Sequence, residues 1–258
     1  MKKILYILTL LPLLCACSHI ADDNQLIYVA PETAKRTVLL EDFTGQRCVN
    51  CPKGTEVIEQ LQKEYGDNIV AVGIYSGDFG KQANGKLLPL TTETGCEYFD
   101  HYVAGYGQPI GMVNRHGAVN YTDWTTTVRD EIVKPSPIEL SLTASINGNN
   151  INITTYEKAK SSDLSGKLQV WVIEDGITTF QFMPDGSTNK DYKHHNVFRT
   201  SVNGTWGNEI TLSMGEEREQ TMIQPINNDW NRNNLSIVAF YYDESGVLQA
   251  TKTKVTTD

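Results

Sequence analysis

The residues best suited to covalent chemistry are Cys48 and Cys51, which stand with two residues between them where a β-rich run gives way to a helical one. Residues 37–43 predict a strand, and a helix to about Tyr65 follows the cysteines. A helix N-terminus offers unpaired N–H groups and partial positive charge, which together stabilise a thiolate. Cys48 is therefore the expected attacking sulfur, and Cys51, one turn in, would close the disulfide and release a partner.

The same pair of cysteines allows two other interpretations. The Cys48–Cys51 bond could be an inert disulfide that pins the start of the helix. A Cys-x-x-Cys sequence is also half of a zinc site, although here only Cys96 and a histidine could complete it. Cys96 itself is either a third redox thiol or, as we favour, a buried free cysteine.

The elements that must position the cysteines occupy residues 35–134, where strand and helix patterns alternate. Val57, Ile58 and Leu61 recur at helical spacing after the cysteines, and residues 69–75 form a nearly continuous apolar run, as in a parallel strand buried on both faces. A long irregular stretch covers residues 76–92. We expect a short helix within residues 94–104, strands over 110–115 and 118–121, and a last helix carrying Trp124, Val128 and Ile132.

Residues 135–258 follow a different pattern, strand after strand. The two halves meet at Lys134-Pro135-Ser136-Pro137, which ends a helix and stiffens the join. Apolar residues alternate with polar ones from Ile138 onward, and turn residues separate seven or eight such runs. This spacing predicts an antiparallel sandwich of the immunoglobulin type. His194 and His195, beside Tyr192 and Arg199, could suggest a metal or anion site, but neighbours in a strand point to opposite faces, which favours a structural or surface role.

The N-terminus carries export signals. A basic head, an apolar run too short to span a bilayer and small residues before Cys17 describe a signal peptide over residues 1–16. Its end resembles the bacterial lipobox, which implies acylation of Cys17 and a lipid-anchored tether over residues 17–34; an ordinary signal peptide is the alternative. The net charge of −9 argues against electrostatic binding to nucleic acid.

The order of elements around the cysteines resembles the thioredoxin fold. In that family an acidic residue followed by Phe often precedes the first cysteine by six positions, as Asp42 does here. The resemblance implies that Asp42 either relays protons for Cys51 or points to solvent, and that Pro109 is a cis-proline facing the disulfide. Two departures leave the direction of any redox reaction open: Arg47 replaces the usual Trp, where its charge could lower the Cys48 pKa further, and Val49-Asn50 replaces Gly-Pro.

Nearly the whole chain resembles the 28-kilodalton outer-membrane lipoproteins of Gram-negative anaerobes, through its lipobox, its Leu-Glu-Asp-Phe-Thr-Gly and Cys-x-Asn-Cys-Pro motifs, and residues 192–199. The resemblance implies a thioredoxin-like domain followed by a β-sandwich, on the periplasmic or cell-surface side of the outer membrane. We expect either thiol–disulfide exchange on exported proteins, without a cofactor or metal, or a non-catalytic surface binding, adhesion or assembly protein whose disulfide is structural.

Overall fold

Two fully buried strands form the centre of the first half. β2 (Val38–Thr44) and β3 (Ile69–Tyr75) pair in parallel, and Asp42 on β2 stands opposite Gly73 on β3. Every residue of both strands is buried, as the sequence predicts for residues 69–75. A computed structural model describes residues 33–257. The predicted signal peptide and Cys17, with nearly all of the tether, lie outside the described residues.

Helices cover both faces of this pair of strands. α1 (Cys51–Tyr65) and α3 (Trp124–Ile132) pack on one face, where Ile58, Leu61 and Trp124 are buried against Val38 and Leu40. α2 (Glu93–Tyr102) lies on the opposite face. The predicted helices are confirmed, because their apolar residues recur every three or four positions and so form one buried side.

Short strands complete this half of the chain. β4 (Ile110–Val113) pairs antiparallel with β2, and β5 (Ala118–Asn120) pairs with β4. At the predicted join, β6 (Pro135–Ser136) pairs back with β1 (Ala34–Lys35), so backbone pairing links the two sides of the join.

The second half forms two β layers around one core. One layer is a four-stranded sheet in the order β14-β8-β7-β17. The facing layer contains β9, β13, β15 and β16, and apolar residues such as Ile138, Leu168 and Ile237 fill the space between the layers. The strands are β7 (Ile138–Asn147), β8 (Asn150–Ala159), β9 (Leu164–Glu174), β13 (Asn208–Leu212), β14 (Glu217–Pro225), β15 (Leu235–Asp243), β16 (Gly246–Lys254) and β17 (Thr256–Thr257).

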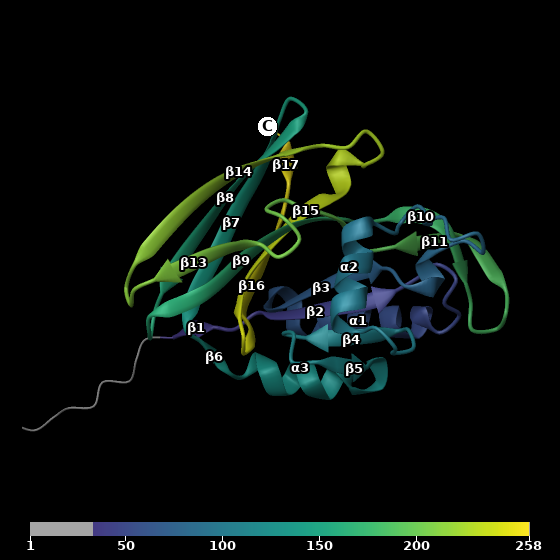
Figure 1. The fold of residues 1–258 in the computed structure, drawn as a ribbon, viewed down its shortest axis with the longest axis horizontal. Coiled ribbons are helices and arrows are strands. Elements are labelled where there is room, and N and C mark those ends of the chain that lie inside the picture. Colours follow the sequence, from purple (N-terminus) through teal and green to yellow (C-terminus); the bar gives the residue numbers. More distant parts are fainter. Residues whose placement is uncertain (1–32, 258) are drawn as a thin grey trace, which may run out of the picture. The chain divides into compact units, whose positions relative to one another are not determined.

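One nine-stranded sheet runs through both halves. Its order is β16-β15-β9-β12-β3-β2-β4-β5, with β13 paired to β9. The joining strand is β12 (Val197–Ser201), which is antiparallel to β9 and meets β3 in parallel at Val197 and Gly73. The Gly73 N–H donates to the Asn196 carbonyl oxygen at 2.8 Å. The described chain is therefore mostly β, and Figure 1 shows its helices gathered around one end of the shared sheet.

A buried arginine of the first half, Arg115, contacts residues of both halves. Arg115 forms a two-pronged ion pair with Glu41, whose side chain is inaccessible to solvent. The guanidinium lies 4.7 Å from the ring centre of Phe240 and 4.6 Å from that of Tyr242, both on β15. Planar guanidinium groups stack on aromatic rings, so this ion pair is enclosed by second-half aromatics.

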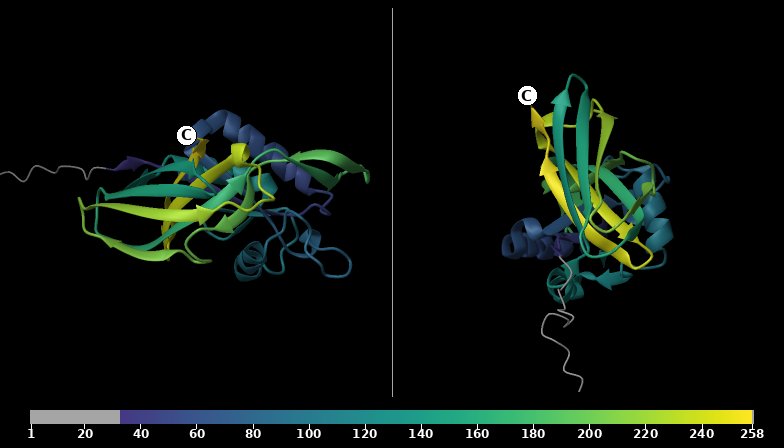
Figure 2. Two further views of the ribbon diagram at one scale, coloured as in Figure 1. Left: turned by 90° about the horizontal axis from the view of Figure 1, so that it is seen from above. Right: turned by 90° about the vertical axis from the view of Figure 1, so that its left-hand side faces the viewer.

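The sequence did not predict the hairpin of β10 (Ile177–Phe182) and β11 (Thr188–His194). It leaves the second half and projects beside the end of β2, as Figures 1 and 2 show. Most residues of its two strands are exposed or half-buried, so these strands lack the alternation of apolar and polar residues seen in the sandwich strands. The sequence does contain one indication of this hairpin: β10 is rich in β-branched and aromatic residues, and the turn residues Pro184-Asp185-Gly186 follow it.

Candidate functional site

Cys48 and Cys51 are joined in a disulfide at the start of α1, with their Cα atoms 5.4 Å apart. Each residue is only 2% exposed. Pro52 occupies the first turn of the helix, where its missing N–H is not needed. The Asn50 side chain does not cap the helix and instead accepts a hydrogen bond from Lys53 Nζ at 3.1 Å. The helix end therefore keeps its positive character beside the sulfur atoms.

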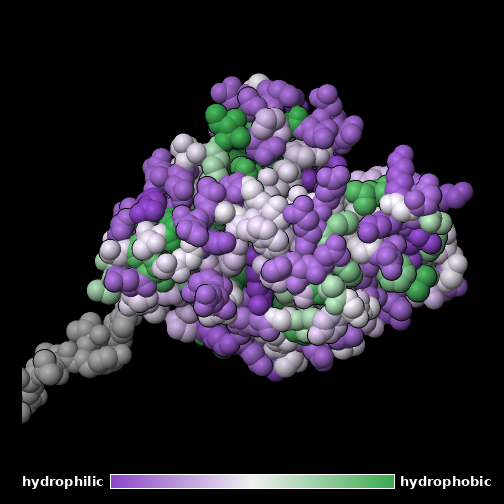
Figure 3. Space-filling model, viewed as in Figure 1, coloured by the Kyte–Doolittle hydropathy of each residue, from purple (hydrophilic) through white to green (hydrophobic). Residues whose placement is uncertain are grey.

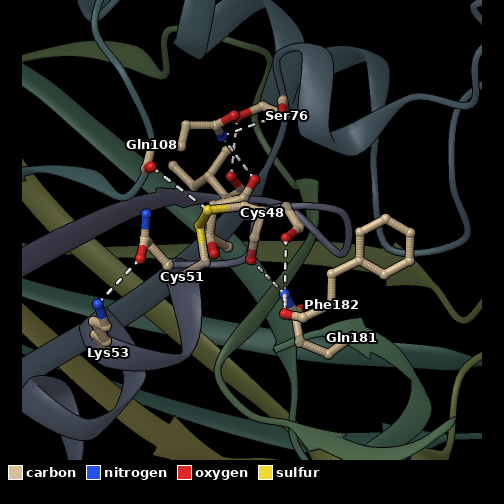
Figure 4. Close-up of a disulfide and its surroundings, with 11 residues drawn as sticks. Cys48, Cys51, Lys53, Ser76, Gln108, Gln181 and Phe182 are labelled. Atoms are coloured by element: carbon tan, nitrogen blue, oxygen red, sulfur yellow. Dashed lines mark hydrogen bonds between the residues drawn. A yellow bond between two sulfur atoms is a disulfide. The ribbon is translucent and has the colours of Figure 1, made fainter. Parts of the chain in front are cut away.

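The loop before β4 approaches the disulfide from one side. The Gln108 carbonyl oxygen lies 3.5 Å from Cys48 Sγ, as Figure 4 shows, and the Gln108–Pro109 peptide bond is cis, as expected. The Gln108 side chain is itself fixed, because its Nε2 donates to the carbonyl oxygens of Thr44 at 2.9 Å and Ser76 at 3.2 Å. This loop is thus held in register with the ends of β2 and β3.

The β10–β11 hairpin forms hydrogen bonds with the loop of residues 45–48, which leads to the disulfide. Gln181 Nε2 donates to the carbonyl oxygens of Cys48 at 2.9 Å and Gly45 at 3.3 Å. The Phe182 N–H donates to the carbonyl oxygen of Gln46 at 2.9 Å, and Gln46 Nε2 donates to that of Phe180 at 3.2 Å. A segment more than 120 residues away in sequence thus fixes the backbone of the disulfide loop.

Arg47, which the sequence suggested as a charge acting on Cys48, is engaged elsewhere. Its Nη1 donates to the Lys81 carbonyl oxygen at 2.8 Å, and its backbone N–H donates to that of Phe79 at 3.2 Å. Arg47 therefore ties the disulfide loop to the long irregular segment of residues 76–92.

Asp42 is a buried acid without a partner. It is 3% exposed, and its Oδ1 atom makes no hydrogen bond. Burial raises the pKa of Asp42 to about 8, because desolvation disfavours the charged carboxylate. The alternative that Asp42 points to bulk solvent is wrong. The acid lies on the side of β2 that faces α1, the helix that Cys51 opens.

A cavity of about 520 Å³ extends from Asp42 beneath α1. Thr55 of α1, Gly73 and Tyr75 of β3, and His194 of β11 line it. Tyr75 Oη lies 2.7 Å from His194 Nδ1, and burial lowers the pKa of His194 to about 4, so the imidazole is neutral at pH 7. The sequence pattern favours a structural or surface role for His194 and does not indicate that it lies near the cysteine pair, because only the tertiary fold brings β11 there.

Of the remaining sequence candidates, His195 also lines the cavity and Cys96 does not. Cys96 is a free, half-buried thiol whose pKa is raised by burial. His195 turns away from His194 and is half-exposed, with Asp175 Oδ1 3.8 Å from its Nδ1. Within residues 33–257, the histidine, cysteine and acidic side chains form no group of three that could hold a metal ion. Over the same residues, no helix combines the length and apolar character that a membrane crossing needs.

Comparison with known proteins gives one family and several similar folds. The family model described as Outer membrane protein Omp28 matches residues 97–258. HBP35 of Porphyromonas gingivalis has 14% identity and a TM-score of 0.68, covering 87% of this chain and 77% of that one. Protein AGR_C_4864 from Agrobacterium tumefaciens has 15% identity and a TM-score of 0.52, covering 86% and 95%. No curated protein matches.

Proposed function

This chain belongs to the outer membrane protein Omp28 family, and we propose that it is a lipid-anchored thiol–disulfide exchange protein. Membership of the family assigns it to the outer membrane. The lipobox-like sequence before Cys17 supports anchoring by acylation of that residue. The clients would be exported proteins that carry cysteines, in a compartment where disulfides persist.

The observation that carries this proposal is the buried, unpartnered Asp42 on the strand that leads to the cysteine pair. Burying a carboxyl group without a hydrogen-bond partner costs stability, and a disulfide that only pins a helix does not require one. A carboxyl group whose pKa is raised to about 8 can both accept and donate a proton near neutral pH. It would supply the proton that a leaving Cys51 thiolate needs.

The remaining parts of a thioredoxin-like site support the same proposal. Cys48 stands at the positive end of α1, which favours its thiolate. The loop of Gln108 and Pro109 lies beside Cys48 and offers backbone groups to an extended client segment. The two sulfur atoms carry the electrons, so the proposed reaction requires no cofactor or metal.

A second candidate function is non-catalytic binding or assembly at the cell surface, with a structural disulfide. Two observations favour this second function: both cysteines have low exposure, and Gln181 donates a hydrogen bond to the Cys48 carbonyl oxygen. On the face shown in Figure 3, apolar surface is divided into small patches among hydrophilic residues. That face therefore offers no large apolar area through which the protein could adhere to a partner.

The test is the reduction potential of the Cys48–Cys51 pair. The soluble protein from residue 33 onward would be equilibrated in glutathione and dithiothreitol buffers, and its free thiols would be trapped and counted by mass. A potential between about −120 and −270 mV is expected, as found for exchange proteins. A potential well below about −300 mV would mark a structural disulfide and favour the binding function.

A further inference from the structure

A surface pocket of about 470 Å³ lies where the irregular segment of residues 76–92 meets the second half of the chain. Its walls come from residues 89–92, from Arg199 and Thr200 of β12, and from the stretch of residues 224–230. Pockets of roughly 300–1,000 Å³ hold small ligands, so this one has a suitable size. It shares no lining residue with the cavity beneath α1.

Arg199 is a nearly buried cation in the wall of this pocket. Its side chain is only 12% exposed, yet its guanidinium forms no hydrogen bond with any residue of the described chain. A buried N–H donor without a partner costs stability, which calls for an acceptor that the chain itself does not supply. The sequence places Arg199 beside two histidines in a candidate anion site, but in the structure those histidines line the other cavity.

Glu174 pairs with this guanidinium without saturating it. Its Oε2 lies 3.4 Å from Arg199 Nε, and both atoms lack a hydrogen bond, while its Oε1 accepts the Asn231 N–H at 2.8 Å. Asp229 also attracts the guanidinium, but neither carboxylate lines the pocket. The Nη groups of Arg199 are neither hydrogen-bonded nor sealed from solvent, so they remain available to an acceptor that enters the pocket.

Trp230 adds an aromatic surface to the same pocket. Its ring centre lies 5.9 Å from Arg199 Cζ, and the residue is half-buried against the sandwich core. The side-chain amides of Gln224 and Asn227 also line the pocket. An aromatic ring among hydrogen-bonding groups suits a ligand with an apolar face and a polar edge, and a sugar ring has both.

The walls of the pocket are fixed by hydrogen bonds within the chain. Thr92 Oγ1 accepts the Gly95 N–H at 3.0 Å and so caps α2. On the other wall, the Trp230 backbone N–H donates to the Asn227 carbonyl oxygen at 3.1 Å. Walls that are ordered in advance lower the entropy cost of binding, so even a small ligand can gain from the few contacts available.

We propose that this pocket binds an acidic saccharide, a sugar that carries a carboxylate. The carboxylate would accept hydrogen bonds from the Arg199 guanidinium, whose planar shape matches it, and the apolar face of the ring would lie on Trp230. Among the described residues that line the pocket, Arg199 is the only charged one, which favours a negative ligand. This inference goes beyond the exchange function and does not depend on the disulfide.

Three small probes test the proposal on the soluble protein from residue 33 onward, at constant ionic strength. Sodium D-glucuronate has both ring and carboxylate, D-glucose has the ring alone, and sodium acetate has the carboxylate alone. Binding is followed by ¹⁵N NMR of the Trp230 indole N–H, which Trp230→Phe assigns. We expect glucuronate to bind with a dissociation constant on the order of 1 mM. Glucose and acetate should each bind about tenfold more weakly or less, because each lacks one anchor.

Arg199→Lys keeps the positive charge beside Glu174 but loses the planar fork. Affinity for glucuronate should fall by about tenfold, while the weak affinity for glucose should stay within about twofold. Arg129→Lys is the matched control, because Arg129 is exposed on α3, and it should leave both affinities unchanged. If Arg199→Lys does not fold, the comparison of the three probes on the wild type still decides.

Three results would overturn the proposed site. Equal affinity for glucose and glucuronate would leave the carboxylate without a role. Equal affinity for acetate and glucuronate would reduce the pocket to an anion site that does not recognise a sugar. The absence of any Trp230 shift with glucuronate would show that no acidic saccharide occupies the pocket. Because none of these measurements involves the cysteines, failure of the exchange function would leave them unaffected.

Discussion

At the scale of single residues, Asp42 makes stability depend on pH. Its pKa is about 8 in the folded protein, against an ordinary value of 3.8, because burial disfavours the carboxylate. The folded state therefore binds more protons than the unfolded state between these values, and stability falls as the pH rises through that window. His194 acts in the opposite sense: its pKa falls from 6.5 to about 4 through burial, so its contribution is lost as the pH falls through that lower window.

Asp42→Asn should remove the loss of stability at alkaline pH. The His194 contribution is common to both proteins, so only the Asp42 contribution should differ between them from pH 6.5 to 8. We expect the wild type to lose roughly 2 kcal/mol of unfolding free energy over this interval relative to Asp42→Asn, at about 1.4 kcal/mol per pH unit. Urea unfolding of both proteins at several pH values measures it. Asp67→Asn, at an exposed position in the α1–β3 turn, should keep the wild-type slope; parallel slopes for Asp42→Asn and the wild type would contradict the assignment.

At the scale of elements, local periodicity determined what could be predicted. β2, α1 and β3 follow from the apolar residues at their own strand or helix spacing, and most sandwich strands follow from alternation. The β10–β11 hairpin did not emerge, because it is largely exposed and lacks that alternation. Tyr75 and His194 are in contact but stand 119 positions apart in the sequence, so no local pattern could indicate the contact.

The hairpin should control access to the disulfide through Gln181. In Gln181→Ala the carbonyl oxygens of Gly45 and Cys48 lose their side-chain donor and keep only the backbone N–H groups of Cys48 and Cys51. Each lost hydrogen bond costs about 0.5–1.5 kcal/mol. The disulfide loop should loosen, so reduction of the native protein by dithiothreitol should become several-fold faster. The rate is measured by trapping thiols at timed intervals.

Gln224→Ala is the matched control for this prediction, because Gln224 is half-buried on β14, far along the chain from the hairpin, and its side chain donates to the neighbouring Pro225 carbonyl oxygen. It should leave the reduction rate unchanged. An unchanged rate in Gln181→Ala, together with wild-type stability, would mean that the hairpin does not restrain the disulfide loop.

At the scale of the whole molecule, the shared sheet makes each half depend on the other. Phe43, Val72 and Ile74 of the first half are buried in the same core as Trp171 and Phe240 of the second. The Arg115–Glu41 pair lies within this core, with both side chains almost wholly buried. The predicted boundary at residue 134 marks a change in sequence pattern, and residues on both sides of it contribute to this core.

Residues 33–134 alone should therefore not form a stable fold. Without β12, β3 loses one of its two partner strands, and without β15 the apolar face beneath α2 is exposed to water. Removing the rings of Phe240 and Tyr242 also uncovers a buried ion pair. We expect the fragment to aggregate or to give a poorly dispersed amide NMR spectrum, whereas residues 33–258 should unfold in one transition by both tryptophan fluorescence and circular dichroism. A fragment that unfolds cooperatively in urea with a free energy near that of the full chain would contradict this interdependence, and the two halves would then be independent domains.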